Sequence, residues 1–262
     1  MPEPRNPYEN PDLYELAFSW RDYAKATDFI SEAARLAGCA EIKSMVELGC
    51  GPGQYCREFG RRGVTAYGVD LSPEMALYAQ RTYDEEKLPG HILEADMRDF
   101  RLEQRVDLAC CMMATFSHLL TNRDIVEHLD AVADNLREGG LYVLELPHPR
   151  DAFDTGKSTQ DVWEMEEEGA KLSIDWCSDG VFDPLTETDL GTVKFSLEQD
   201  GLVKNYESPS ESRRLVFGTL RALLDLSGRF HIAAMYGDLD VNIPFDNAKA
   251  AWRLVLVLRK SP

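Results

Sequence analysis

The sequence has little positive charge. Its 28 lysines and arginines stand against 46 aspartates and glutamates, which gives a formal net charge of -18. So acidic a surface repels phosphate groups, and neither a nucleic acid nor an anionic membrane is an expected partner. The six cysteines form no Cys-x-x-Cys pair, which argues against a zinc site or a disulfide framework. We therefore expect a reduced, cytoplasmic protein with buried thiols and no bound metal.

Long apolar runs are also missing. No stretch approaches the length of a membrane-spanning helix, and Met1–Pro7 lacks the apolar segment of a signal peptide. Hydrophobic residues nevertheless make up 44% of the 262 residues, which is enough for one large domain or for one domain with a sizeable insertion. No pattern specifies an oligomeric state.

Strand-like and helix-like segments alternate from Met45 to Leu146. Short apolar runs predict strands, and segments with one apolar face predict the helices between them. Ser72 and Pro73 have the residue types that begin a helix. This alternation predicts an α/β fold with a parallel, doubly wound sheet. The predicted strands are 45–48, 64–69, 91–95, 106–113 and 141–146, and the helices are 53–61, a helix from Ser72, and 121–136 with Gly139-Gly140 at its end.

The pattern changes after Pro147. Alternating runs at 161–165, 171–176 and 191–197 are separated by Ser-Asp-Gly, Asp-Pro and Gln-Asp-Gly turn signals, which predicts antiparallel hairpins. A helix at 219–226 and two strands at 230–236 and 252–258 follow. We expect three parts: residues 1–40 as an N-terminal helical cap, 41–147 with 218–262 as the α/β domain, and 148–217 as an antiparallel β insertion. Within the cap, residues 1–11 are expected to be a loose arm and 13–36 a helix.

A glycine-rich turn follows the first predicted strand. Residues 47–53 read Glu-Leu-Gly-Cys-Gly-Pro-Gly. Glycines let the chain turn sharply and let a ligand lie against bare backbone. The spacing departs from the Gly-x-Gly-x-x-Gly fingerprint of dinucleotide binding, because Gln54 occupies the third glycine position. The turn indicates a nucleoside site of another kind, with a purely structural turn as the alternative.

Two acids end the next two predicted strands. Asp70 and Asp96 fall at carboxyl ends, where ligands bind in an open parallel sheet. A carboxylate at Asp70 can accept hydrogen bonds from both hydroxyls of a ribose, and one at Asp96 can accept from an adenine amino group. The alternatives are a helix cap or surface acid for Asp70 and a turn residue for Asp96.

Taken in this order, the motifs resemble those of the class I S-adenosylmethionine-dependent methyltransferases. Residues 47–53 look like the first motif of that family, 69–72 like its ribose motif, and 95–97 like its adenine motif. Residues 107–112 resemble the strand beneath the methyl donor, and 136–141 the segment that leads into the fifth strand. The resemblance covers about residues 40–147 and the last two strands.

The resemblance implies a Rossmann-like, doubly wound, seven-stranded sheet, mostly parallel with the last strand antiparallel. It implies S-adenosyl-L-methionine as cofactor and an antiparallel lid over a small-molecule acceptor. In similar enzymes an N-terminal helix folds over the donor, and Arg21 is the candidate to pair with its carboxylate. A solvated helix arginine is the alternative. The implied cofactor-binding residues are Arg21, Glu47, Gly49, Cys50, Gly51, Gly53, Asp70, Leu71, Met75, Asp96, Met97 and Met112.

His118 is the candidate catalytic base. It follows the fourth predicted strand, and an imidazole titrates near neutral pH. A base is needed only if the nucleophile arrives protonated. Related enzymes often have Asn-His or Asn-Tyr here, whereas this chain has Ser117 before the histidine and Ala114 where a polar residue is common. A capping or core histidine is the alternative.

We predict an S-adenosylmethionine-dependent methyltransferase that acts on a small molecule at nitrogen or oxygen. One alternative is a nicotinamide-dependent oxidoreductase of similar topology, against which Glu47 and Gln54 argue. A second is a protein that binds S-adenosylmethionine without transferring its methyl group. In the insertion, Trp163 and Trp176 are candidates to face the acceptor. The pair Arg213-Arg214 could neutralise an acidic acceptor or form charge pairs at a strand edge.

Overall fold

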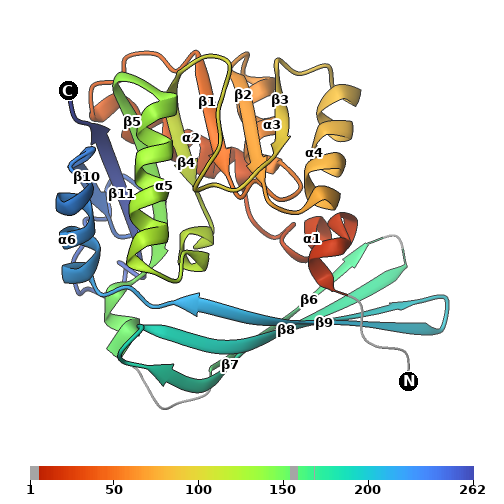
Figure 1. The fold of residues 1–262 in the computed structure, drawn as a ribbon. Coiled ribbons are helices and arrows are strands. Elements are labelled where there is room, and N and C mark those ends of the chain that lie inside the picture. Colours follow the sequence, from red (N-terminus) through yellow and green to blue (C-terminus); the bar gives the residue numbers. More distant parts are fainter. Residues whose placement is uncertain (1–5, 154–158, 168) are drawn as a thin grey trace.

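Two β-sheets lie one above the other in this protein (Figure 1). The structure is a computed structural model and describes residues 6–153, 159–167 and 169–262. The larger sheet has seven strands in the order β10-β11-β5-β4-β1-β2-β3, and the smaller has four in the order β6-β7-β8-β9. The carboxyl ends of the parallel strands of the larger sheet point towards the smaller sheet (Figure 1).

The larger sheet has the predicted topology. Only β11 runs against its neighbours, since it pairs antiparallel with both β5 and β10 while the other pairs are parallel. The prediction of a mostly parallel, doubly wound sheet with an antiparallel last strand is confirmed. Its strands are β1 Ser44–Leu48, β2 Thr65–Asp70, β3 Gly90–Glu94, β4 Val106–Cys111, β5 Leu136–Pro147, β10 Phe230–Tyr236 and β11 Arg253–Lys260.

Helices cover both faces of this sheet, and each face has its own core. Successive strand residues point to opposite faces, so Cys110 packs in one cluster and Cys111 in the other. One cluster takes residues of α5 and α6, and the other takes residues of α2 and α3. The main helices are α2 Tyr23–Leu36, α3 Gln54–Arg61, α4 Pro73–Glu85, α5 Asn122–Asn135 and α6 Phe217–Ser227.

The smaller sheet is the predicted antiparallel insertion, and we call it the lid sheet. It has four strands where three alternating runs were noted. The fourth, Leu202–Arg213, was missed because its pattern is mostly polar and contains Pro209, which an edge strand tolerates. The strands are β6 Thr159–Glu167, β7 Ala170–Asp183, β8 Thr188–Gln199 and β9 Leu202–Arg213.

The N-terminal segment differs from the single helix expected at 13–36. It forms a short 3-10 helix, η1, at Pro7–Glu9, then α1 at Pro11–Ala17, and α2 begins only at Tyr23. The Asp22 side chain accepts a hydrogen bond from the backbone N–H of Lys25 and caps α2. The spacing of apolar residues indicates which side chains are buried, but it does not reveal that the helix is interrupted between Ala17 and Tyr23. Residues 1–5 of the expected loose arm lie outside the described residues.

Two turn signals proved to belong to strands. Gly139 lies within β5, which begins directly at Leu136 after the last turn of α5. The Ser-Asp-Gly signal at 178–180 lies within β7, where pairing with β8 shifts between Ser178 and Phe182. Such a shift is a bulge, which needs the same residue types as a turn.

Candidate functional site

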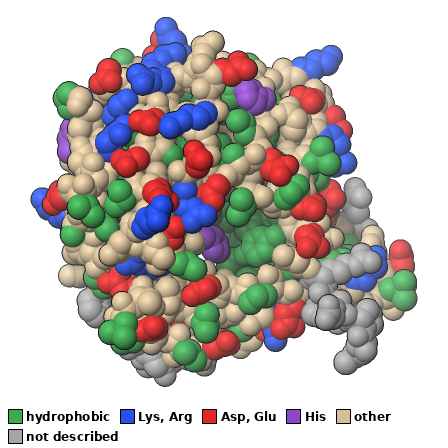
Figure 2. All heavy atoms as spheres, viewed as in Figure 1, with side chains coloured by type: hydrophobic (Ala, Val, Ile, Leu, Met, Phe, Trp, Pro, Cys, Tyr) green, Lys and Arg blue, Asp and Glu red, His purple; other side chains and the backbone are tan. Residues whose placement is uncertain are grey.

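The predicted site residues gather where strands β1 to β4 end. Strands β1 and β2 are paired in register, with Leu48 opposite Val69, and β4 flanks β1 on its other side. Leu48 precedes Gly49 and Val69 precedes Asp70, so the glycine turn and Asp70 begin side by side. In Figure 2 the molecule is hollowed between the larger sheet and the lid sheet, and hydrophobic side chains line this hollow.

The glycine turn has a backbone that other residues adopt with difficulty. The φ angles of Gly49, Gly51 and Gly53 are 63°, 52° and 81°. A Cβ atom on Gly49 would lie 2.3 Å from Cγ2 of Thr115, in the segment after β4. The turn is thus pressed against that segment, and glycine at position 49 is required by space as well as by conformation.

Asp70 joins the glycine turn to the next strand end. One carboxylate oxygen accepts a hydrogen bond from the backbone N–H of Gly51 at 2.7 Å, and the other accepts from the N–H of Ser72 at 2.9 Å. Burial raises the pKa of Asp70, and these bonds oppose that rise. The ionised carboxylate has about four lone-pair sites, so beside its backbone partners it can still accept a hydrogen bond from a hydroxyl group. An acceptor at this place fits the ribose of S-adenosylmethionine, whose hydroxyls donate.

Glu47 and Cys50 lie beneath the turn. Glu47 is buried and accepts hydrogen bonds from the N–H and the Sγ of Cys56, both at 3.2 Å. Desolvation raises the pKa of Glu47 to about 8. Cys50 fills space left by Gly68, where a Cβ would lie 2.7 Å from its sulfur. The bonds to Cys56 join the end of β1 to α3, and contact of Glu47 or Cys50 with the donor stays a prediction.

The predicted adenine-side residues are more scattered. Asp96 lies two residues after the end of β3 and pairs with Arg98, whose Nη2 lies 2.6 Å from its carboxylate. The Met97 carbonyl bonds to Nδ1 of His128 at 2.9 Å. Leu71 is 70% exposed and Met75 is buried on α4. Contact of Asp96 and Met97 with the adenine, and of Leu71 and Met75 with the donor, stays a prediction.

The segment after β4 is strained and leads to His118. Met113 and Ala114 are consecutive non-glycine residues with φ of 54° and 60°. Such a conformation costs about 1–2 kcal/mol per residue and persists only where surrounding contacts impose it. The short helix η2, Thr115–His118, follows these two residues, and Met112, which precedes them, is buried just after the end of β4.

His118 faces the lid sheet. Desolvation lowers the pKa of His118 below its usual 6.5, while a hydrogen bond with the Glu211 backbone and the charge of Asp70 partly offset this. A lowered pKa favours the neutral imidazole, which can accept a proton, and the side chain is exposed in the structure. Its role as a base stays a prediction.

Arg21 lies in the connection between α1 and α2 and is buried. Its Nη2 lies 2.6 Å from a carboxylate oxygen of Glu145, and its Nε donates to the Tyr55 hydroxyl at 2.7 Å. Burial alone would lower the pKa of Arg21, but the Glu145 charge raises it above its ordinary value. Sequence reasoning missed Glu145, although a single acid within the apolar run 141–146 was a usable signal.

Helix α1 and the residues before it cover the glycine turn. The Tyr14 ring comes within 4.0 Å of the Cβ position of Gly51, and the Ser72 hydroxyl donates to the carbonyl of Tyr8 at 3.3 Å. On its other side α1 packs against the lid sheet, where Nε1 of Trp163 donates to the carbonyl of Ala17 at 2.7 Å. The N-terminal segment thus lies between the strand ends and the lid sheet.

Comparison with known families identifies the α/β core. Residues 45–140, which hold the glycine turn, Asp70, Asp96 and His118, match a family model described as a methyltransferase domain. The core of the chain is therefore similar to methyltransferase domains, in agreement with the resemblance of its motifs to the class I S-adenosylmethionine-dependent family.

Curated methyltransferases resemble the core in sequence. A dTDP-3-amino-3,4,6-trideoxy-alpha-D-glucopyranose N,N-dimethyltransferase from Streptomyces venezuelae is 28% identical over 140 residues, covering 52% of this chain and 56% of that protein. A dTDP-3-amino-3,6-dideoxy-alpha-D-glucopyranose N,N-dimethyltransferase from Streptomyces fradiae is 29% identical over 140 residues, covering 51% of each. The chain thus spans about half the length of the curated relatives it matches.

Solved structures share the whole fold, lid sheet included. An S-adenosylmethionine-dependent methyltransferase from Clostridium acetobutylicum superposes with a TM-score of 0.78 at 16% identity, covering 95% of this chain and 96% of that one. An amino pentose methyltransferase from Micromonospora echinaspora, solved with S-adenosylmethionine bound, gives 0.74 at 18% identity, covering 95% and 97%. At these identities the likeness establishes the fold alone.

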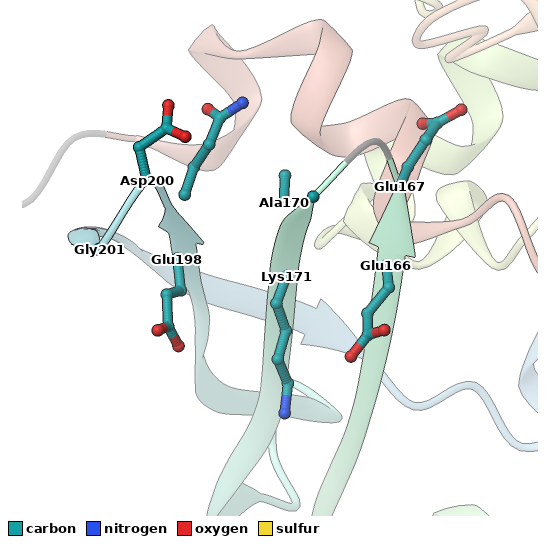
Figure 3. Close-up of a pocket in the computed structure, with 9 residues that line it drawn as sticks. Glu166, Glu167, Ala170, Lys171, Glu198, Asp200 and Gly201 are labelled. Carbon is teal, nitrogen blue, oxygen red and sulfur yellow. The ribbon is translucent and has the colours of Figure 1, made fainter.

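The outer end of the lid sheet has a separate hollow (Figure 3). Its lining is acidic, with Glu166, Glu167, Glu198 and Asp200 around the turns of the two hairpins. Lys171 stands between Glu166 and Glu198, and its Nζ lies 2.9 Å from Glu164. This hollow is open and charged, and it lacks the exclusion of water that methyl transfer needs.

The two arginines proposed for an acidic acceptor are engaged within the protein. Arg213 lies 3.0 Å from Glu187, and Arg214 lies 2.6 Å from Asp189. These contacts support the alternative of charge pairs at the strand edge.

In the part of the chain that the structure describes, no cluster of His, Cys, Asp or Glu is arranged to hold a metal ion. None of the described helices is both long and apolar enough to cross a lipid bilayer.

Proposed function

We propose that this chain transfers a methyl group from S-adenosylmethionine to an amino group of a small, sugar-like molecule. The observation that carries the proposal is the bond between Asp70 and Gly51, which fixes a glycine turn and a ribose-binding carboxylate side by side at two strand ends. The two curated relatives named above methylate amino groups of nucleotide-linked sugars.

The chemistry suits the surroundings of His118. When bound, S-adenosylmethionine supplies an electrophilic methyl group on a positively charged sulfur. An amine attacks only when neutral, and a site that disfavours charge lowers the pKa of an amine as it lowers that of His118. As the new N–C bond forms, the neutral His118 ring can take the proton that the nitrogen loses.

The lid sheet is proposed to enclose the acceptor. Its buried face is apolar and aromatic, and Trp163 and Trp176 both lie close to Phe18 of the N-terminal segment. Such a face excludes water from the reacting atoms and packs against the carbon skeleton of an acceptor. We keep the three-part division of the chain into cap, α/β domain and lid as part of this proposal.

The six free cysteines support a reducing compartment such as the cytoplasm.

Calorimetric titration with S-adenosylhomocysteine and with NADH tests the cofactor. We expect binding of the first and none of the second. Transfer of a labelled methyl group is then measured on matched amino, hydroxyl and carboxyl sugars, free and nucleotide-linked. Activity confined to amino sugars supports the proposal. Activity on a hydroxyl alone, or tight donor binding without transfer to any acceptor in the set, contradicts it.

A further inference from the structure

Glu145 is the centre of a buried charge cluster that no donor-binding motif includes. Its side chain is about 6% exposed. One oxygen accepts from Nη2 of Arg21 at 2.6 Å and from the backbone N–H of Met113 at 2.9 Å. The other oxygen accepts from Nη1 of Arg253. The carboxylate therefore holds two arginines and one backbone amide at once.

The partners of Glu145 come from segments far apart in the chain. Arg21 belongs to the connection between α1 and α2, Met113 to the segment after β4, and Arg253 to β11. Arg253 is held in turn, since its Nε lies 2.9 Å from Asp238 and its guanidinium carbon lies 3.6 Å from the centre of the Trp252 ring. Arg253 is thus fixed on β11. Arg21 and Met113 belong to the two segments that border the proposed donor site.

Both of those segments touch the glycine turn. The N-terminal segment places Tyr14 over Gly51, and the segment after β4 places Thr115 against Gly49. Met113 and Ala114 have left-handed backbones, which require an external contact to hold them. The bond from the Met113 N–H to Glu145 is such a contact.

We propose that Glu145 is a positioning residue that ties the N-terminal cap to the segment after β4, so that both order around the donor as one unit. The link to the donor rests on the proposed function. The coupling between the cap and the segment after β4 is a property of the protein without donor. Glu145 touches neither donor nor acceptor in this assignment and acts through Arg21 and Met113.

A carboxylate is needed because two buried cations depend on it. Glutamine at 145 offers one carbonyl oxygen for three donors. It leaves Arg21 without its counter-charge and Arg253 with Asp238 alone. We therefore expect Glu145→Gln to release both segments, and Arg21→Met to loosen the segment after β4 even though Arg21 makes no bond to it. Glu187→Gln is the matched control, because Glu187 also accepts from an arginine and a second donor but lies at the lid sheet.

The experiment combines amide hydrogen exchange on the donor-free protein with calorimetric binding of S-adenosylhomocysteine. In Glu145→Gln we expect exchange to rise at least 10-fold in both 18–22 and 113–118, and donor affinity to fall about 10-fold. Arg21→Met should raise exchange at 113–118, and Arg21→Lys should restore part of the protection. Glu187→Gln should change neither segment nor the affinity.

Two results would overturn the inference. One is increased exchange in only one of the two segments of Glu145→Gln, or in neither. The other is unchanged exchange at 113–118 in Arg21→Met, which decides the question even if Glu145→Gln does not fold. Failure of the wild-type protein to bind S-adenosylhomocysteine would instead contradict the proposed function, because the exchange measurements need no donor.

Discussion

The carboxylate of Asp70 accepts a 2.7 Å hydrogen bond from the backbone N–H of Gly51. The bond runs from the end of β2 to the turn after β1, so the acid that is proposed to hold the ribose also fixes the backbone on which the donor lies. Tyr14 covers this pair from the N-terminal side, and Asp70 contributes to raising the pKa of Tyr14. The side chain that fixes the shape of the turn is thus also the one proposed to contact the ligand.

Replacement of that carboxylate should weaken donor binding. Asp70→Asn loses the charge-assisted bonds but keeps the size of the side chain. Such bonds contribute about 1.5–3 kcal/mol, so affinity for S-adenosylhomocysteine should fall about 10- to 100-fold by calorimetry. Asp84→Asn, on the exposed face of α4, is the control and should bind normally. Unchanged affinity in Asp70→Asn would remove the ribose assignment.

Replacing Gly49 by alanine should lower the free energy of unfolding more than replacing Gly63 by alanine. Both positions have left-handed backbones, and each substitution costs about 1–2 kcal/mol for that reason. Only Gly49 adds a collision, with Thr115 at 2.3 Å, whereas nothing lies within 4 Å of a Cβ at Gly63. Urea unfolding should show a larger loss for Gly49→Ala, and adding Thr115→Ser should recover part of it. Equal losses at the two glycines would contradict the close contact.

The rate of methyl transfer should fall in acid as His118 becomes protonated. Because desolvation lowers its pKa, the acid limb of kcat/KM should have its midpoint below 6.5. His118→Asn should reduce kcat and abolish that limb, while the affinity for S-adenosylhomocysteine stays unchanged. A variant with full turnover and the same pH profile would show that His118 is not the base.

Glu47 should make the folded protein less stable as the pH rises. Its pKa is about 8 in the folded protein and 4.5 ordinarily, so between these values the native state keeps a proton that the unfolded chain has released. Stability then falls from about pH 4.5 to about pH 8 and levels off above it. Glu47→Gln should flatten this decline in Tm, whereas Glu103→Gln, an exposed carboxylate, should preserve it. An unaltered decline in Glu47→Gln would show that Glu47 is ionised throughout.

Much of the α/β core followed from local pattern. Apolar runs gave its strands to within a few residues, and Ser72 with Pro73 marked the start of α4. The positions of Gly49, Gly51 and Asp70 were also predictable, because carboxyl ends of neighbouring parallel strands must meet at one edge. The N-terminal break at Phe18–Asp22 was not, because one capping side chain decided it.

The ionic partners were the least predictable part of the site. Contact of Arg21 with the donor carboxylate stays a prediction, whereas its bond to Glu145, 124 residues away in the chain, could not be foreseen. Asp96 pairs with Arg98, and Arg213 pairs with Glu187. A long charged side chain can reach many partners, and sequence spacing does not select among them.

By itself, the sequence determined the parallel sheet, the glycine turn and the acid at the neighbouring strand end, since each depends on short-range periodicity and on conformations that glycine adopts readily. Only the tertiary structure decided which charges meet, that Tyr14 covers Gly51, and that Glu145 joins the cap to the strained segment after β4. Those contacts depend on how distant segments pack. A buried charge without a partner destabilises the fold, so burial selects the arrangement in which each charge is paired.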